Sequence, residues 1–293
     1  MKNYIQLFAT GMILFLFISC EDTETPMALF DYQIDGITVQ FTNYSTDADE
    51  YLWDFGDGNS STEENPLHEY AESGNFIITL TAKGKGGSKT IKEMLKIQKP
   101  ALIQIDGSFD DWNAVPSEQL SSVSSADDAS LTALQEMKAC ADDNYLYIYL
   151  VYDQSKVAPL DIFINTDNDV ATGGNSWLWD PCGADFLIEG FSTEKMEDAT
   201  VFNWPADKPQ DGWEWVEVLG SGSGITRMSE PKTISGNIVE AEISIIKEML
   251  PTSLASEIGI GIFSSNEDWA ETGSLPNASS GSPAVPLIKV KTE

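Results

Sequence analysis

The sequence predicts an all-β protein made of two β-sandwich domains, a smaller one followed by a larger one. Short stretches of alternating apolar and polar residues recur along the chain and are separated by glycine, asparagine and aspartate turns. Residues 145–152, Tyr-Leu-Tyr-Ile-Tyr-Leu-Val-Tyr, are apolar or aromatic on both faces, which fits a central strand covered by a second sheet. An aromatic content of 10% argues against the disorder that an acidic composition can produce.

The first domain is expected at residues 28–98. Its predicted strands are residues 37–42, 51–53, 76–82 and 90–97. Turn-forming pairs, among them Asp35-Gly36 and Ser73-Gly74, separate these stretches. A small β-sandwich follows from this pattern.

A motif within this domain resembles the PKD family. Residues 53–58 read Trp-Asp-Phe-Gly-Asp-Gly, and residues 65–70 supply the Asn-Pro-x-His-x-Tyr that follows in that family. The resemblance implies an immunoglobulin-like fold, with Trp53 and Phe55 in the core and a structural role for His68. It also implies that the domain acts as an extracellular spacer or contact module.

The second domain is expected at residues 102–293, which is long enough for a sizeable core. Its strand candidates are residues 102–105, 132–141, 145–152, 160–166, 184–188, 200–204, 213–218, 237–246, 258–263 and 285–290. Only residues 246–250 and parts of residues 116–131 have helical character.

Three motifs in this domain resemble the family 9 carbohydrate-binding modules and the sandwich group related to them. They are residues 105–112 (Ile-Asp-Gly-Ser-Phe-Asp-Asp-Trp), residues 140–147 (Cys-Ala-Asp-Asp-Asn-Tyr-Leu-Tyr) and residues 163–167 (Phe-Ile-Asn-Thr-Asp). Residues 191–235 depart from the family pattern. The resemblance implies a jelly-roll-like sandwich in which Trp112 plugs the fold and Asp106 and Asp111 cap turns. This fold commonly carries Ca²⁺ and grips a sugar between two tryptophans.

A loop of carboxylates, amides and glycines follows the expected strand 160–166. Closely spaced side-chain oxygens are the ligands that Ca²⁺ prefers, and Gly173 and Gly174 allow a tight turn. The candidate ligands are Asp167, Asn168, Asp169, Thr172 and Asp185. The alternative is that these residues only form turns between two strands, since the spacing lacks the full EF-hand pattern.

Two tryptophans in the same loop are candidates for stacking on a sugar ring. Trp177 and Trp179 are two residues apart, so on a regular strand they would share a face, and glycine and proline surround them. Asn175, Asp180 and Glu189 are the expected partners for sugar hydroxyls. Trp213 and Trp215 have the same spacing, and we expect one of the two pairs to be core.

The first 19 residues have the pattern of a secretion signal, with an apolar core too short to span a membrane. The run Leu-Phe-Ile-Ser-Cys at residues 16–20 resembles the lipobox of bacterial lipoproteins, which implies acylation of Cys20. The acidic residues after it resemble the signals that send lipoproteins of Bacteroidetes-type bacteria to the cell surface. Residues 20–27 are then a tether, and the expected location is the outer membrane.

The chain carries 16 basic against 47 acidic residues, a formal charge of −31. Such a surface repels nucleic acid and suits neutral ligands and divalent cations. The expected partners are a polysaccharide or oligosaccharide, the membrane through the lipid anchor, and neighbouring glycan-processing proteins.

Cys140 and Cys182 are left once Cys20 is acylated. An even pair in an exported protein can form a disulfide. The alternative is that Cys140 is a small buried strand residue.

Three functions are compatible with these features. The first is a surface lipoprotein that binds a neutral polysaccharide without catalysis, with the PKD domain as spacer. The second is a structural or adhesion protein whose loop is stiffened by Ca²⁺. The third, a glycoside hydrolase, needs two suitably spaced carboxyl groups, and among 47 acidic residues such pairs carry no information.

Overall fold

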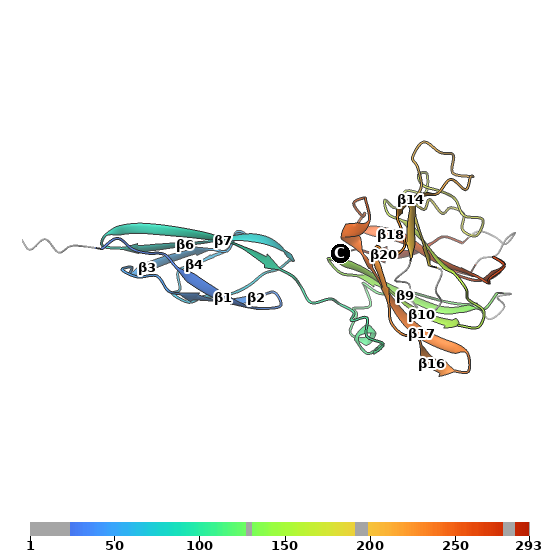
Figure 1. The fold of residues 1–293 in the computed structure, drawn as a ribbon, viewed down its shortest axis with the longest axis horizontal. Coiled ribbons are helices and arrows are strands. Elements are labelled where there is room, and N and C mark those ends of the chain that lie inside the picture. Colours follow the sequence, from blue (N-terminus) through green and yellow to red (C-terminus); the bar gives the residue numbers. More distant parts are fainter. Residues whose placement is uncertain (1–23, 127–130, 191–198, 278–284, 293) are drawn as a thin grey trace, which may run out of the picture. The chain divides into compact units, whose positions relative to one another are not determined.

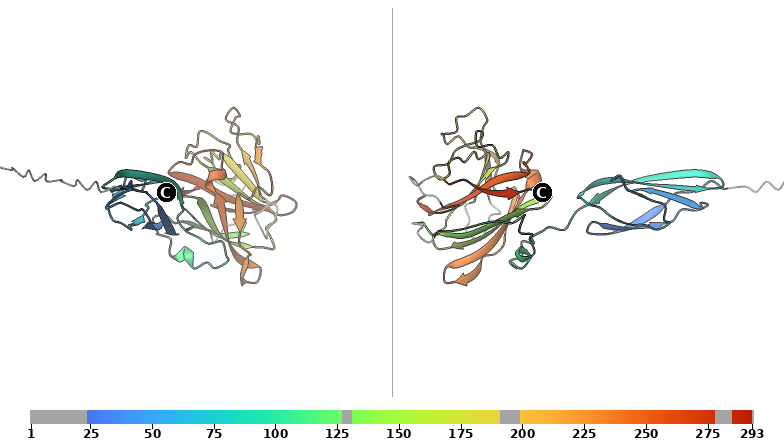
Figure 2. Two further views of the ribbon diagram at one scale, coloured as in Figure 1. Left: turned by 60° about the vertical axis from the view of Figure 1, so that its left-hand side comes forward. Right: turned by 180° about the vertical axis from the view of Figure 1, so that it is seen from behind.

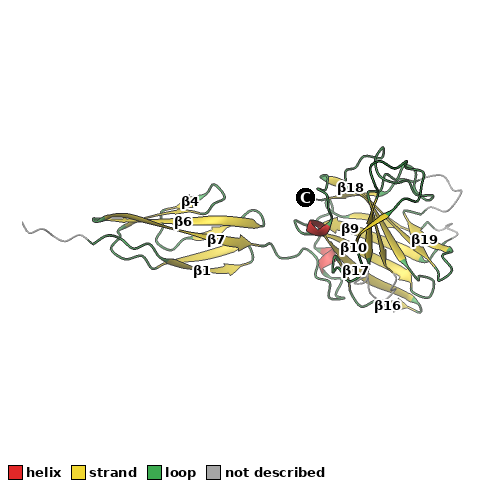
Figure 3. Ribbon diagram, turned by 45° about the horizontal axis from the view of Figure 1, so that its top comes forward, coloured by secondary structure: helices red, strands yellow, loops and turns green. Residues whose placement is uncertain are grey.

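The computed structural model describes residues 24–126, 131–190, 199–277 and 285–292. The chain divides into two compact units, Met1–Lys99 and Pro100–Glu293, and almost all regular elements among the described residues are strands (Figure 3). The predicted all-β class is confirmed. Within the described ranges, no helix is long and apolar enough to cross a membrane. The predicted signal, residues 1–19, and Cys20 lie outside the described residues.

The first unit is a sandwich of two antiparallel sheets, with strand orders β1-β2-β5 and β4-β3-β6-β7 (Figure 1). The strands are β1 (Phe30–Asp35), β2 (Thr38–Asn43), β3 (Glu50–Asp54), β4 (Ser60–Ser61), β5 (Leu67–Glu69), β6 (Gly74–Gly84) and β7 (Gly87–Ile97). Phe41, Trp53 and Ile78 fill the space between the sheets and are fully buried.

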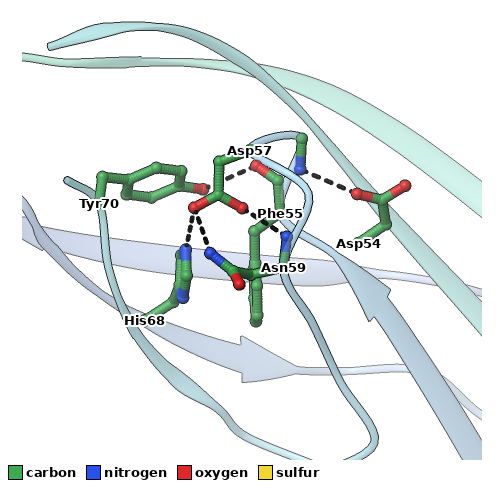
Figure 4. Close-up of polar contacts among 7 residues, drawn as sticks. Asp54, Phe55, Asp57, Asn59, His68 and Tyr70 are labelled. Atoms are coloured by element: carbon green, nitrogen blue, oxygen red, sulfur yellow. Dashed lines mark hydrogen bonds and ion pairs between the residues drawn. The ribbon is translucent and has the colours of Figure 1, made fainter. Parts of the chain in front are cut away.

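The turn after β3 is locked by a carboxylate, Asp57 (Figure 4). Asp57 accepts hydrogen bonds from the backbone and side-chain nitrogens of Asn59, both at 3.0 Å, and its Oδ2 lies 2.8 Å from Nε2 of His68. The His68 ring stacks on Phe55 with centroids 4.0 Å apart. Gly56 has φ +80°, and a Cβ there would lie 2.8 Å from the backbone of Ile77, so only glycine fits.

The second unit is also a sandwich of two antiparallel sheets (Figures 1 and 2). The sheet with order β15-β17-β10-β9-β8, plus β16 beside β17, contains β8 (Ser121–Ser124), β9 (Leu134–Ala141), β10 (Tyr145–Asp153), β15 (Thr226–Met228), β16 (Lys232–Ser235) and β17 (Ile238–Ile246). The sheet with order β14-β13-β12-β11-β18-β19, plus β20 beside β18, contains β11 (Leu160–Asn165), β12 (Phe186–Gly190), β13 (Thr200–Asn203), β14 (Val216–Leu219), β18 (Glu257–Ser265), β19 (Glu271–Leu275) and β20 (Ile288–Lys291). We call these the six-stranded and the seven-stranded sheet.

The main core of this unit lies between the two sheets, but each sheet also carries a buried cluster on its outer face. Strands β10 and β11 are therefore buried on both sides. Outer layers of this kind explain the double-faced apolar pattern at residues 145–152 better than a single opposing sheet.

The outer layer of the six-stranded sheet includes the opening motif of the domain. Glu242 is fully buried and accepts hydrogen bonds from the Asp106 and Gly107 backbone nitrogens, at 2.9 and 2.8 Å, and from Trp112 Nε1 at 3.1 Å. Asp111 accepts a bond from the Gln104 backbone nitrogen at 2.7 Å. These contacts fix the 3₁₀ turn η1 (Asp111–Asn113) against the sheet.

Several expected elements differ from the structure. Residues 121–124, within the segment expected to be partly helical, form β8, and residues 102–105 are not a strand. The helical pattern at residues 246–250 yields only the 3₁₀ turn η3 (Lys247–Met249). Pairing with neighbouring strands, as between β8 and β9, outweighs weak local preference.

The environment of Asp57 predicts an acid-sensitive first unit. Burial alone would raise the pKa of Asp57, but hydrogen bonds from Asn59 and His68 outweigh it and lower the pKa. The ionised form is therefore favoured by folding, and this stability is lost as the pH falls below the ordinary value of 3.8. Asp57→Asn should destabilise the unit at pH 7 by about 1–3 kcal/mol, with a smaller effect near pH 3.

The measurement is urea unfolding followed through the ring protons of His68 by NMR, because this is the only histidine and it reports on the first unit alone. Asp49→Asn, at an exposed aspartate of the same unit, is the control and should leave the midpoint unchanged. Equal midpoints for Asp57→Asn and the unsubstituted chain at pH 7 would contradict this account.

Candidate functional site

The outer face of the seven-stranded sheet carries a buried cluster beneath the loops that follow β11 and β13. Phe163, Leu187 and Phe263 project from the strands into this cluster. We call it the outer cluster, and its buried members are Phe163, Leu178, Trp179, Cys182, Ala184, Leu187, Phe263 and Leu287. It anchors the loops to the sheet.

The loop between β11 and β12 is closed at its base by backbone pairing. Gly174 and Ala184 exchange hydrogen bonds of 2.8 and 2.9 Å. Gly173 has φ +65°, and a Cβ there would lie 2.5 Å from the Ala184 carbonyl oxygen, so glycine is required. The closed base makes residues 175–183 a compact loop lying on the sheet.

Trp179 lies inside this loop and is fully buried, so the expectation that it stacks on a ligand is wrong. Its Nε1 donates to the Pro276 carbonyl oxygen at 3.1 Å, and its ring meets Phe163 edge-on at 5.4 Å. The ring fits because residue 261 is glycine: a Cβ there would lie 2.9 Å from the Trp179 ring. Trp179 is an anchor of the loop.

Trp177 is 45% exposed, as expected. Its Nε1 donates to Glu271 Oε1 at 2.7 Å, and its ring lies nearly perpendicular to that of Phe263, with centroids 5.5 Å apart. The ring of Trp213, which is 55% exposed, lies beside it at 5.4 Å with an interplanar angle of 50°. We call Trp177 and Trp213 the aromatic pair.

Both tryptophan doublets are therefore divided between interior and surface. Trp215 is half-buried and packs against Phe163 and Trp204 at 6.0 and 5.1 Å, whereas Trp213 is exposed. The expectation that one whole doublet would be core fails because neither lies on a regular strand; β14 starts only at Val216. Sequence spacing carried no signal that would have matched Trp177 with Trp213.

Hydrogen bonds join the two loops that carry the aromatic pair. The Asn175 backbone nitrogen donates to the Gln210 carbonyl oxygen at 2.9 Å. The Gln210 side-chain nitrogen Nε2 donates to the carbonyl oxygens of Val170 and Thr172 at 3.2 and 2.6 Å. Asn175 Nδ2 lies 3.5 Å from Asp211 Oδ1. The expected polar residue Asn175 is thus on the loop beside the aromatic pair, with Asp211 and Glu271 as additional polar groups that the sequence did not single out.

Glu189 lies on the same sheet face. Its partner across the β11–β12 pair is Asp161, and the partner of Asp161 in β18 is Phe263, so the three residues form a row that ends beneath Trp177. Asp180, the remaining expected partner for sugar hydroxyls, is exposed in the same loop as Trp177.

Asp161 is a buried acid that the sequence did not reveal, because it stands in an apolar strand. It is 3% exposed, and among the described residues its Oδ1 has no hydrogen-bond partner. Burial, together with the charge of Glu189, raises the pKa of Asp161 to about 8, and burial raises the pKa of Glu189 as well. Asp161 is therefore largely protonated at neutral pH.

Four of the five expected calcium ligands take part in hydrogen bonds of the loop and of the strand that precedes it. Asp167 accepts bonds from the Asp169 nitrogen and the Thr172 hydroxyl, at 2.8 and 2.9 Å, and Asn168 accepts one from Lys289. Asp185 is turned inward and accepts two bonds of 2.7 Å from Thr166. Across the described stretches, no three His, Cys, Asp or Glu side chains gather as a metal site requires. These contacts favour the turn-forming interpretation, and calcium binding stays a prediction.

The expected disulfide does not form. Cys140 and Cys182 are both buried free thiols, and burial raises the pKa of each to about 12. Cys140 belongs to the cluster outside the six-stranded sheet, while Cys182 belongs to the outer cluster of the opposite sheet. The whole sandwich core separates them, which exceeds the reach of a disulfide.

Fold and site together define a two-unit β-sandwich protein whose second unit exposes an aromatic pair. Residues 25–98 match the family model of the PKD domain, so the first unit is a PKD domain. Over 90 residues the chain is 38% identical to the pre-pro-metalloprotease PrtV of Vibrio cholerae, covering 29% of this chain and 10% of that protein. Over 66 residues it is 39% identical to collagenase ColA of Bacillus cereus, covering 22% and 7%.

Two solved structures are similar to parts of this chain. The PKD1 domain of Vibrio anguillarum Epp is 31% identical, with 27% of this chain and all of that chain covered and a TM-score of 0.26. A structure described as a carbohydrate-binding module of the β-sandwich superfamily covers 82% of this chain and 96% of its own, at 13% identity and a TM-score of 0.26. That likeness carries no argument about a ligand.

The buried Asp161 predicts that the second unit loses stability as the pH rises from about 4 to about 8. A pKa raised from 3.8 to about 8 means that the folded state holds a proton which the unfolded state releases over this window. Asp161→Asn keeps a neutral side chain at every pH, so the slope of stability against pH should become smaller.

Denaturant unfolding followed by tryptophan fluorescence at several pH values provides the measurement, since seven of the eight tryptophans belong to the second unit. Asp180→Asn, at an exposed aspartate, should retain the original slope. Parallel profiles for Asp161→Asn and the unsubstituted chain would show that Asp161 is not protonated in the folded protein.

Proposed function

We propose that this chain binds a neutral polysaccharide or oligosaccharide at the aromatic pair. The observation that carries the proposal is the position of Trp177 and Trp213: two large rings 5.4 Å apart, each about half exposed, on loops anchored to a rigid sheet. Exposed indoles that are fixed from below are uncommon on surfaces without a binding role.

Sugar rings match such a surface because their C–H faces stack on aromatic planes while their hydroxyls need hydrogen-bond partners. Glu271 and the Asn175–Asp211 pair supply carboxylate and amide groups beside the rings. Glu271 also holds the Trp177 indole in place, which lowers the entropy cost of ordering that ring on binding.

The remaining parts of the chain support a role at a bacterial surface. The PKD domain is proposed as a spacer between an acylated Cys20 at the outer membrane and the sugar-binding unit. The proposed activity is binding without catalysis, which delivers polysaccharide to neighbouring glycan-processing proteins. If purified protein released reducing ends from a bound glycan, the proposal of a non-catalytic role would be wrong.

Single substitutions in the aromatic pair test the binding site. Residues 21–293, which contain every described residue, are applied to an array of neutral glycans, and each hit is titrated by calorimetry. Trp177→Ala and Trp213→Ala should each weaken binding about tenfold or more, as expected for the loss of about 1–3 kcal/mol of ring stacking.

Tyr44→Ala, at an exposed tyrosine of the PKD domain, is the control and should bind as tightly as the unsubstituted chain. Trp179→Ala should instead lower stability, because that ring is core. The proposed site would be refuted if no glycan on the array bound. It would also be refuted if glycans bound with an affinity that neither Trp177→Ala nor Trp213→Ala changed. Stabilisation by Ca²⁺ without any glycan binding would favour the structural alternative.

A further inference from the structure

A pocket lies on the outer face of the six-stranded sheet, the sheet opposite the one that carries the aromatic pair. Its volume is about 240 Å³, and it is bounded by residues 101–105, by β10 and β17, and by the start of β15. This is smaller than the clefts of roughly 300–1,000 Å³ that hold drug-sized ligands. The pocket is therefore of a size that suits a monosaccharide.

One row of side chains crosses the floor of this pocket. Tyr147 of β10 pairs with Ser244 of β17, and Ser244 pairs with Arg227 of β15. Directly paired residues on neighbouring strands have Cβ atoms about 4.5–5.5 Å apart, so these three side chains leave the sheet side by side, and all three line the pocket. Tyr145 extends the aromatic wall, with its ring 5.7 Å from that of Tyr147.

Arg227 is the only arginine in a chain with 47 acidic residues. Its side chain is exposed at the pocket, and among the described residues it has no hydrogen-bond or ion-pair partner. An arginine in so acidic a protein normally finds a carboxylate nearby.

Two acids near this row, Glu242 and Asp142, accept hydrogen bonds from other donors. Glu242, two residues before Ser244, receives three hydrogen bonds from the backbone of Asp106 and Gly107 and from Trp112. Asp142 accepts the Tyr147 hydroxyl at 2.6 Å and the Leu102 backbone nitrogen at 2.9 Å. The fold thus holds its own carboxylates in place and leaves the guanidinium facing the pocket.

We propose that this pocket binds an acidic monosaccharide unit, with the carboxylate of a uronic acid on Arg227. A guanidinium forms paired hydrogen bonds to a carboxylate, and Ser244 adds a hydroxyl beside it. Tyr145 and the apolar wall, which includes Ile103 and Ile246, suit the C–H face of a sugar ring. A single guanidinium within a chain of charge −31 favours a monoanion over a phosphate of higher charge.

The site is independent of the proposed aromatic-pair function, because the two lie on opposite sheets of the second unit. Calorimetric titration of residues 21–293 with glucuronate should show binding with roughly millimolar affinity. Glucose, acetate and inorganic phosphate are titrated in parallel, and each should bind at least about tenfold more weakly than glucuronate, the factor that one good interaction supplies.

Arg227→Gln should weaken glucuronate binding about tenfold or more, because the charge-assisted pair is lost. Arg227→Lys keeps the positive charge but cannot form the paired hydrogen bonds. Its affinity for glucuronate should therefore lie between those of Arg227→Gln and the unsubstituted chain. Trp177→Ala should leave glucuronate binding unchanged. Circular dichroism and the melting temperature should match for all variants, since Arg227 is exposed.

Glucuronate binding that is equal in Arg227→Gln and the unsubstituted chain would overturn the proposal. The proposal would also be overturned if glucose, acetate or phosphate bound as tightly as glucuronate. A lack of detectable glucuronate binding up to about 10 mM would overturn it too, because a small site is expected to bind with roughly millimolar affinity.

Discussion

The burial of the Trp179 indole anchors the loop that presents Trp177 at the surface. The ring lies on the outer face of the seven-stranded sheet, where Gly261 leaves space that a Cβ atom would fill. Trp179 and the backbone pairing of Gly174 with Ala184 hold this loop against the sheet. Trp177, in the same loop, contacts Phe263 and also contacts Trp213, which lies in a loop 36 residues further along the chain.

The sequence predicted the class of fold well and the site only in part. Alternation and turn residues are local signals, and they identified both sandwiches; the PKD motif around Trp53 specified the first one closely. The sequence could not predict that one tryptophan of each doublet is more buried than the other. Residues 175–183 and 204–215 are loops, and the rule that residues two apart share a face applies only to regular strands. Asp161 and Glu271 were missed for a related reason: their importance comes from partners on other strands, which spacing along the chain does not encode.

Several of the many acidic side chains accept hydrogen bonds from nearby donors. Asp57, Asp142 and Glu242 each accept several donors from turns or outer layers, so these acids serve the fold. The carboxylates that were expected to hold calcium follow the same pattern, with Asp167 and Asp185 both capped by nearby donors. Such satisfied acids explain how an exposed aromatic pair and an unpaired arginine can coexist with a formal charge of −31.

The central claim is that the aromatic pair meets the ligand. Indole N–H signals in NMR spectra of residues 21–293, assigned by single substitutions, resolve each tryptophan separately. On titration with a neutral glycan that binds, the account predicts shifts for Trp177 and Trp213, while the signals of the buried Trp53, Trp112 and Trp179 stay in place. Glycan binding that shifts tryptophans outside the pair and leaves both Trp177 and Trp213 unmoved would contradict it.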